Sequence, residues 1–245
     1  MAYYHCILLD ADNTLLDFSA SEEKALGETL EHFQLPLDEE TKAKYRAINT
    51  QLWAALERGE IKKDKLLTER FVRFLRAIGA KGDASTLNRY YLGQLAQHAD
   101  VVPGAREVLK ELGEVATLAV ASNGVERVQL GRLEAAGLRP YLDEVFISEK
   151  MGVTKPSRRF FDLALRTLGV ENRAKVLMVG DSLKADIQGA AQAGIASCWY
   201  DPTGQENTTG IKPDYTITTL EELYDIVMEE EERQNVGLTH RKHQV

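Results

Sequence analysis

The segment CILLDADNTLLD, residues 6–17, constrains the fold of this chain more than any other. A short apolar run near the N-terminus is typical of a strand that is buried on both faces of a parallel sheet. The run ends in two acids, Asp10 and Asp12, which would lie in the crevice at the carboxyl ends of the strands. Because uncompensated charge beside a core is costly, packing alone does not explain these acids. A bound cation or a phosphoryl group would explain them.

The rest of the chain divides into two parts by its hydrophobic pattern. Residues 19–98 repeat apolar side chains at helical spacing, without strand-like alternation. From about residue 100, strand-like runs alternate with helical segments, which predicts a parallel sheet covered by helices. We therefore expect an α/β fold with a Rossmann-like core, residues 1–17 and 99–245, and an inserted α-helical cap, residues 18–98. Because the insertion follows the two acids directly, the cap should lie over their crevice.

Local sequence signals predict where two helices begin and where the ordered part of the chain ends. Ser19 and Glu22 have the spacing of a capping box, in which each side chain bonds the other residue's backbone N–H. Pro156 is expected at the first position of a helix, where its missing N–H costs nothing. The charged segment 230–245 is expected to fray into a mobile tail.

Charge and composition exclude several classes of function. Asp and Glu number 38 against 30 Lys and Arg, so the formal net charge is −8 and a general nucleic-acid binder is not expected. The sequence contains neither a long uncharged apolar run for a membrane span nor the pattern of a signal peptide. We expect a cytoplasmic protein with reduced cysteines and a small-molecule partner. The sequence leaves the oligomeric state open.

Polar side chains follow two more of the predicted strands where each strand ends, and another opens the helix after a third strand. They are Ser122, Asn123 and Gly124 after TLAVA, Lys155 after EVFIS, and Asp181 and Asp186 after VLMVG. Because parallel strands end at the same edge of a sheet, we expect these groups to converge with Asp10 and Asp12 on one crevice.

The residue types in this crevice suit a metal and a phosphate. Hard oxygen ligands from Asp10, the carbonyl of Asp12 and Asp181 favour Mg²⁺. The hydroxyl of Ser122, the backbone of Asn123 and Gly124, and the ammonium of Lys155 are suited to binding phosphate oxygens. A small phosphorylated metabolite is therefore the expected partner.

The acids then have separate expected tasks. Asp10 would attack phosphorus and form an aspartyl-phosphate. Asp12 would protonate the leaving alkoxide and later deprotonate the attacking water. For Asp186 two roles stay open, because it could cap the helix that follows, or orient Asp181 and a metal-bound water from outside the ligand set.

Four segments of the core resemble a known enzyme superfamily. DADNT, the run ending in SNG, KPSRRFF and GDSLKAD are similar, in order and role, to the four motifs of the haloacid dehalogenase-like (HAD) phosphatases. The match covers the whole core, and the helical insertion resembles their small helical cap. The resemblance implies a Mg²⁺-dependent phosphatase that works through an aspartyl-phosphate.

The resemblance narrows to one subfamily. NTQLWAALERGEI at 49–61 and VLMVGDSLKADIQGAAQAGIASCWYD at 176–201 are similar to the HAD pyrimidine 5'-nucleotidases. This likeness implies a nucleoside 5'-monophosphate as substrate, including non-canonical pyrimidine nucleotides. In the cap, Trp53 and Arg70 are candidate contacts to the base or sugar, with core packing and a surface salt bridge as the respective alternatives.

Other functions stay open at this point. A sugar phosphate or phosphoglycolate could be the substrate, and a phosphomutase could use the same scaffold. A dehalogenase would have no use for Asp12. From other classes, a phospho-receiver domain also gathers acids, a hydroxyl and a lysine, but an eighty-residue cap would be superfluous there. A binding module without activity would not need the full set of acids.

Overall fold

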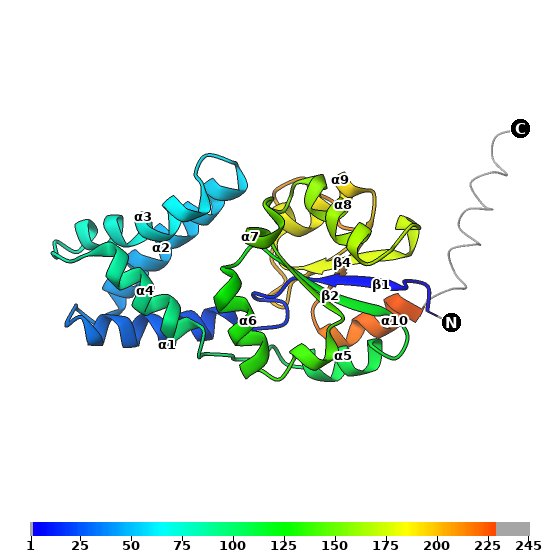
Figure 1. The fold of residues 1–245 in the computed structure, drawn as a ribbon, viewed down its shortest axis with the longest axis horizontal. Helices are drawn as coiled ribbons and strands as arrows, with labels where there is room; N and C mark the ends of the chain where they lie inside the picture. Colours follow the sequence, from blue (N-terminus) through cyan, green and yellow to red (C-terminus); the bar gives the residue numbers. More distant parts are fainter. Residues whose placement is uncertain (1, 229–245) are drawn as a thin grey trace, which may run out of the picture.

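The computed structural model describes residues 2–228, and its centre is a parallel sheet (Figure 1). Within these residues six strands pair in the order β3-β2-β1-β4-β5-β6. Their bounds are Cys6–Leu9 for β1, Thr117–Ser122 for β2, Glu144–Ile147 for β3, Val176–Gly180 for β4, Ala196–Tyr200 for β5 and Tyr215–Ile217 for β6. All pairings are parallel. The predicted Rossmann-like α/β core is confirmed.

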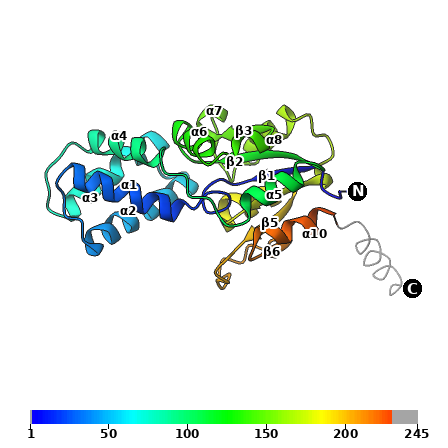
Figure 2. The ribbon, with the colours of Figure 1, turned by 90° about the horizontal axis from the view of Figure 1, so that it is seen from below.

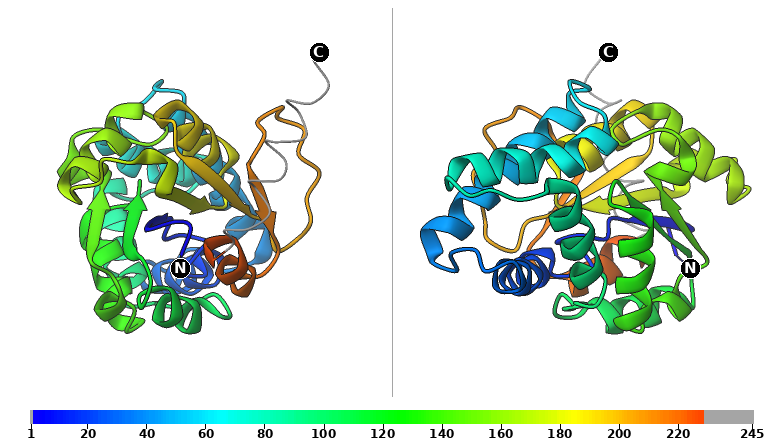
Figure 3. Two further views of the ribbon diagram at one scale, coloured as in Figure 1. Left: turned by 90° about the vertical axis from the view of Figure 1, so that its right-hand side faces the viewer. Right: turned by 60° about the vertical axis from the view of Figure 1, so that its left-hand side comes forward.

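Helices cover both faces of the sheet. The core helices are α5 (Ala105–Leu112), α6 (Glu126–Ala135), α7 (Ser148–Met151), α8 (Arg158–Thr167), α9 (Gly189–Ala193) and α10 (Leu223–Met228). Helices α5 and α10 pack on one face, and α8 and α9 on the other (Figure 3, left). Alternate residues of β1 serve the two faces: Ile7 and Leu9 contact the first layer, and Cys6 and Leu8 the second. This explains why the strands are apolar without alternation.

The register brings the carboxyl ends of the central strands together. Leu9 of β1 pairs with Val120 of β2 on one side and with Val179 of β4 on the other. The N–H of Asp10 continues this ladder by donating to the carbonyl of Val179 at 2.9 Å. The residues that follow β1, β2 and β4 therefore lie at one edge of the sheet, as the sequence predicts.

Four helices interrupt the chain between β1 and the rest of the sheet. They are α1 (Phe18–His32), α2 (Glu39–Glu57), α3 (Lys63–Ala77) and α4 (Ala84–Leu95). They lie together to the left of the core in Figures 1 and 2. Their apolar stripes form a separate buried cluster that includes Leu26, Tyr45, Phe71 and Phe74. We call α1–α4 the cap helices; the exact division at residues 18 and 98 stays a prediction.

The structure corrects two expected helix starts. Helix α1 begins at Phe18, and its N-cap is Asp17, whose side chain accepts from the N–H of Ala20 at 2.9 Å. The capping box of Ser19 and Glu22 is therefore wrong. Helix α8 begins at Arg158 rather than at Pro156, and the Lys155–Pro156 peptide bond is cis.

Two other expectations concern a membrane span and the C-terminal end of the chain. Among residues 2–228, no helix combines the length and the apolar character that a membrane crossing needs. The predicted mobile tail, residues 230–245, lies outside the described residues.

Candidate active site

Three carboxylates and one ammonium form the centre of the crevice. Asp10, Asp181 and Asp186 each offer an oxygen, and these oxygens lie within 4.8 Å of one another. The Nζ of Lys155 donates to one oxygen of Asp10 and to one of Asp186, both at 2.6 Å. Lys155 is 1% exposed and Asp186 is fully buried. These four side chains, which the sequence predicts to converge, therefore lie together in the structure.

The charges in this cluster do not balance. With all side chains ionised, three carboxylates and one ammonium leave a net charge of −2 in a largely buried place; Lys155 pairs with Asp10 and Asp186. Burial raises the pKa of Asp10 well above its usual value; Lys155 opposes this, and the neighbouring acids add to it. Burial, and then Asp186, raises the pKa of Asp181 to about 7. A divalent cation with a preference for hard oxygens, such as Mg²⁺, would restore the balance, so the donor set fits this metal.

Lys155 stays charged in this setting. Burial alone would lower the pKa of its ammonium, but Asp10 and Asp186 outweigh that effect and the pKa lies above its usual value. A permanent buried cation is therefore available beside Asp10 for the oxygens of an anionic ligand.

Asp186 does not act as the helix cap that one reading of the sequence proposed. The N-cap position belongs to Ser182, whose hydroxyl accepts from the N–H of Ala185 at 3.0 Å. The turn that follows is a π-helix, Leu183–Gln188, which places Asp186 against Lys155 and the N–H of Ser182. Gly180 permits this close approach, because a Cβ there would lie 2.2 Å from a carboxylate oxygen of Asp186. The role of Asp186 in orienting Asp181 and a metal-bound water stays a prediction.

This close approach makes a testable prediction about Gly180. Gly180→Ala should lower the free energy of unfolding by about 1–3 kcal/mol, because the new methyl group overpacks the site. Urea unfolding in the presence of EDTA measures the change. Gly93→Ala is the matched control: this helical glycine has no atom within 4 Å of a built Cβ, and alanine should stabilise the helix slightly. Equal effects of the two substitutions would contradict the steric argument.

The end of β2 and the start of the next loop, Ser122, Asn123 and Gly124, lie at the same edge of the sheet as Asp10, because β2 pairs with β1; we call these three residues the Ser122 wall. The hydroxyl of Ser122 accepts from the N–H of Gly124 at 3.0 Å and from Nε2 of Gln129 at 2.9 Å. The Asn123 side chain pairs twice with the backbone of Lys155, through Nδ2 to its carbonyl and through Oδ1 from its N–H, each at 2.9 Å. Asn123 therefore positions the lysine with its side chain, and only its backbone remains a candidate phosphate ligand.

Asp12 lies beside this wall and is held from helix α6. Its Oδ1 forms an ion pair with Arg132, and its Oδ2 accepts from Nε2 of Gln129 at 2.8 Å. Sequence reasoning missed both partners. Neither residue carries a local signal in the sequence; only the structure shows that both are buried positions of α6.

The two cap candidates lie within the cap helices. Arg70 is 2% exposed, and its guanidinium donates to the side chains of Asn88 at 2.7 Å and Asn49 at 3.3 Å. It is therefore not a surface salt bridge. Trp53 is half-buried and packs against the apolar cluster of Leu52, Leu56 and Leu66. Their role as substrate contacts stays a prediction.

Lys63 is a cap residue that sequence reasoning missed and that reaches the core. It stands at the start of α3, and its Nζ donates to the carbonyl of Gly124 at 2.9 Å and to the hydroxyl of Ser148 at 2.6 Å. Burial lowers the pKa of this ammonium, and Glu149 partly opposes the shift. The cap thus contacts the loop that carries the candidate phosphate ligands.

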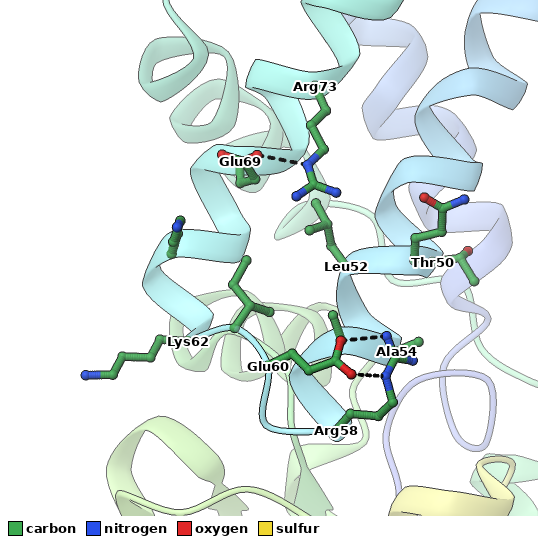
Figure 4. A pocket seen from close by; sticks show the side chains of 12 residues that line it. Thr50, Leu52, Ala54, Arg58, Glu60, Lys62, Glu69 and Arg73 are labelled. Atoms are coloured by element: carbon green, nitrogen blue, oxygen red, sulfur yellow. Dashed lines mark hydrogen bonds and ion pairs between the residues drawn. The ribbon is translucent and has the colours of Figure 1, made fainter.

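A hollow of about 860 Å³ lies apart from these acids, between α2 and α3 of the cap (Figure 4). Its charged lining is partly neutralised by two ion pairs, Arg58 with Glu60 and Arg73 with Glu69. None of the residues that line it belongs to the strand ends. The hollow is therefore a feature of the cap surface and not part of the crevice.

The acid cluster has a linked pH and metal dependence. Because the folded pKa of Asp181 is about 7 and lies above its unfolded value, folding takes up a proton, and this stabilisation is lost as pH rises from about 4 to about 7. In EDTA the loss should amount to a few kcal/mol, since one pKa unit corresponds to about 1.4 kcal/mol. Mg²⁺ should reverse it.

Unfolding by urea across this pH range is the measurement for that prediction. Other carboxyl groups also titrate, so the contribution of Asp181 is the difference between the protein and its Asp181→Asn variant. The fall with pH should be shallower in the variant. An identical pH dependence in both proteins, or no effect of Mg²⁺ near pH 8, would count against the linkage.

Comparison with known proteins places this geometry in a family. The family model for haloacid dehalogenase-like hydrolases matches residues 4–194. The pyrimidine 5'-nucleotidase PynA of Streptococcus pneumoniae is 38% identical, with 91% of this chain and 94% of the relative covered. The pyrimidine 5'-nucleotidase YjjG of Escherichia coli is 33% identical, with 90% and 96% covered.

A solved structure agrees with these matches in three dimensions. The HAD-hydrolase YfnB of Bacillus subtilis, crystallised with bound magnesium, is 35% identical and superposes with a TM-score of 0.87. The superposition covers 91% of this chain and 98% of that one. The family model, the relatives and the fold all agree, and the chain is a member of the haloacid dehalogenase-like hydrolases.

Proposed function

We propose that this protein is a Mg²⁺-dependent phosphatase that hydrolyses nucleoside 5'-monophosphates, with pyrimidine nucleotides preferred. The observation that carries the proposal is the buried cluster of Asp10, Asp181 and Asp186 around Lys155, with its uncompensated negative charge. The choice of a nucleotide rests on the two relatives that are named pyrimidine 5'-nucleotidases, each of which the chain matches over nine-tenths of its length.

Asp10 is the proposed nucleophile. One of its carboxylate oxygens attacks phosphorus, the bond from phosphorus to the ester oxygen breaks, and an aspartyl-phosphate forms. Lys155, 2.6 Å from Asp10, holds the carboxylate in place and offers positive charge to the phosphate. The hydroxyl of Ser122 and the backbone of Asn123 and Gly124 would hold the remaining phosphate oxygens.

The residues that would hold the metal are Asp10, Asp12 through its carbonyl, and Asp181. Asp186 supports this set from outside, because its carboxylate is already paired with Lys155 and with the N–H of Ser182. When bound, the cation would supply positive charge that lets a carboxylate and a phosphate approach each other.

Asp12 is the proposed acid and base. In the first half of the reaction it gives its proton to the leaving alkoxide as the P–O bond breaks. In the second half it takes a proton from the water that attacks the aspartyl-phosphate, so that it ends in its starting state. Gln129, which bonds both Asp12 and Ser122, supports this assignment, because both events would occur beside the bound phosphate.

A phosphate-release screen tests the proposed function. The esters compared at fixed Mg²⁺ are pyrimidine and purine nucleoside 5'-monophosphates, sugar phosphates and phosphoglycolate. We expect the highest kcat/KM for a pyrimidine nucleotide and loss of all activity in EDTA. A preference for a sugar phosphate or phosphoglycolate would overturn the substrate assignment, and activity indifferent to EDTA would overturn the metal assignment.

A further inference from the structure

Arg132 connects the proposed acid/base to the places where the chain passes between core and cap. It is fully buried, and its side chain lies between Asp12 and the two connecting segments, which are residues 17–21 and residues 98–100. Nε donates to the carbonyl of His98 at 3.1 Å, and Nη2 donates to the hydroxyl of Ser21 at 3.3 Å. Ser21 stands in the first turn of α1, and His98 follows α4. One guanidinium thus contacts both connections.

Three more contacts strengthen this junction. The guanidinium carbon of Arg132 lies 5.6 Å from the centre of the Phe18 ring, at the start of α1. The hydroxyl of Ser21 donates in turn to Asp100 at 3.2 Å, and the carbonyl of Asp100 accepts from the N–H of Asp17. The two connecting segments are therefore bonded to each other as well as to Arg132.

The other side of Arg132 fixes the carboxylate of Asp12. Both carboxylate oxygens have a partner from α6, Arg132 on Oδ1 and Gln129 on Oδ2. A carboxylate that is held at both oxygens cannot rotate freely, and a planar guanidinium fixes its partner's orientation better than a point charge does. Gln129 also contacts Ser122, so helix α6 connects Asp12 to the Ser122 wall.

We propose that Arg132 is a positioning residue for Asp12, and that it makes proton transfer at Asp12 depend on where the cap helices stand. The inference deepens the proposed function and rests on it. Arg132 does not touch the substrate in this view: it acts through Asp12, and Ser21 and His98 act through Arg132.

The test separates positioning of the proton donor from general damage to the protein. A nucleoside monophosphate has a poor leaving group and needs a proton, whereas 4-nitrophenyl phosphate has a good leaving group and does not. The value of kcat/KM covers only the steps up to departure of the leaving group. Arg132→Met should therefore lower kcat/KM about 10²-fold for the nucleotide and by less than about threefold for 4-nitrophenyl phosphate.

Three single variants and one double variant make the result specific. Asp12→Asn should show the same selective loss, and adding Arg132→Met to it should cause no further selective loss, because the arginine acts through that carboxylate. Arg132→Lys should recover part of the nucleotide activity. Arg106→Met is the matched control, because this exposed arginine also binds backbone carbonyls at the end of α6, those of Ala136 and Gly137.

Failure of the inference and failure of the proposed function look different. If the unmodified protein releases phosphate from none of the esters, the proposed function is wrong. If it is active but Arg132→Met loses activity equally on both esters, or loses none, Arg132 does not position Asp12. If Arg132→Met does not fold, Ser21→Ala and Arg132→Lys replace it in the test. Each should show a smaller loss of kcat/KM that is confined to the nucleotide. Equal losses on both esters would again overturn the inference.

Discussion

Asp10→Asn is expected to abolish phosphate release, with kcat reduced by at least about 10⁴-fold, because an amide cannot form the covalent intermediate. The substitution should not harm the fold. Removal of one of three mutually repelling acids relieves the uncompensated charge in the crevice, and Lys155 keeps Asp186 as a partner. In EDTA at neutral pH, the melting temperature should therefore equal or exceed that of the unmodified protein.

The measurement pairs phosphate release with thermal unfolding of the same preparation. Asp225→Asn is the matched control, because this exposed aspartate of α10 lies outside the crevice. It should leave kcat unchanged. If Asp10→Asn retained more than about one hundredth of the original kcat while the control behaved as expected, a different nucleophile would be required.

The residues that sequence reasoning found share a local signature. Asp10 and Asp181 each follow an apolar strand directly, and Ser122 is the last residue of one; a parallel sheet must bring such ends to one edge. Lys155 lies further along the chain from its strand, β3. It still reaches the crevice, because the side chain of Asn123 forms two hydrogen bonds with its backbone. The fold class and the acids of the site could therefore be predicted from the pattern of strands along the chain, whereas the position of Lys155 depends on Asn123.

The missed residues depend on tertiary contacts with no local signature. Gln129 and Arg132 look like ordinary polar positions of a surface helix. Both are buried in the structure, where Gln129 contacts Asp12 and Ser122, and Arg132 contacts Asp12, Ser21 and His98. Lys63 meets Gly124, a residue 61 positions further along the chain. Where local signals compete, the sequence is also ambiguous: Asp17 and Ser19 are both good N-cap residues, and Asp17 takes the cap of α1.

Lys155→Met tests the second large effect, because it removes the central cation while it keeps a side chain of similar length. Asp10 and Asp186 then face each other without their shared partner, at the centre of a cluster that is already short of positive charge. Removing one member of a buried ion pair typically costs about 3–5 kcal/mol. We expect a loss of this order in the free energy of unfolding in EDTA near pH 8, where the acids would otherwise ionise.

Mg²⁺ separates the two expected roles of Lys155, which are to stabilise the fold and to bind the phosphate. A bound cation compensates the acids, so Mg²⁺ should restore much of the lost stability of Lys155→Met. It should not restore activity, because the phosphate loses a positive partner and Asp10 loses the group that orients it; a fall in kcat/KM of about 10²–10³-fold is expected. Lys150→Met, at an exposed position of α7, is the matched control. If Mg²⁺ restored activity together with stability, Lys155 would be a structural counter-charge and not a ligand of the substrate, and the phosphate would have to be held by the Ser122 wall alone.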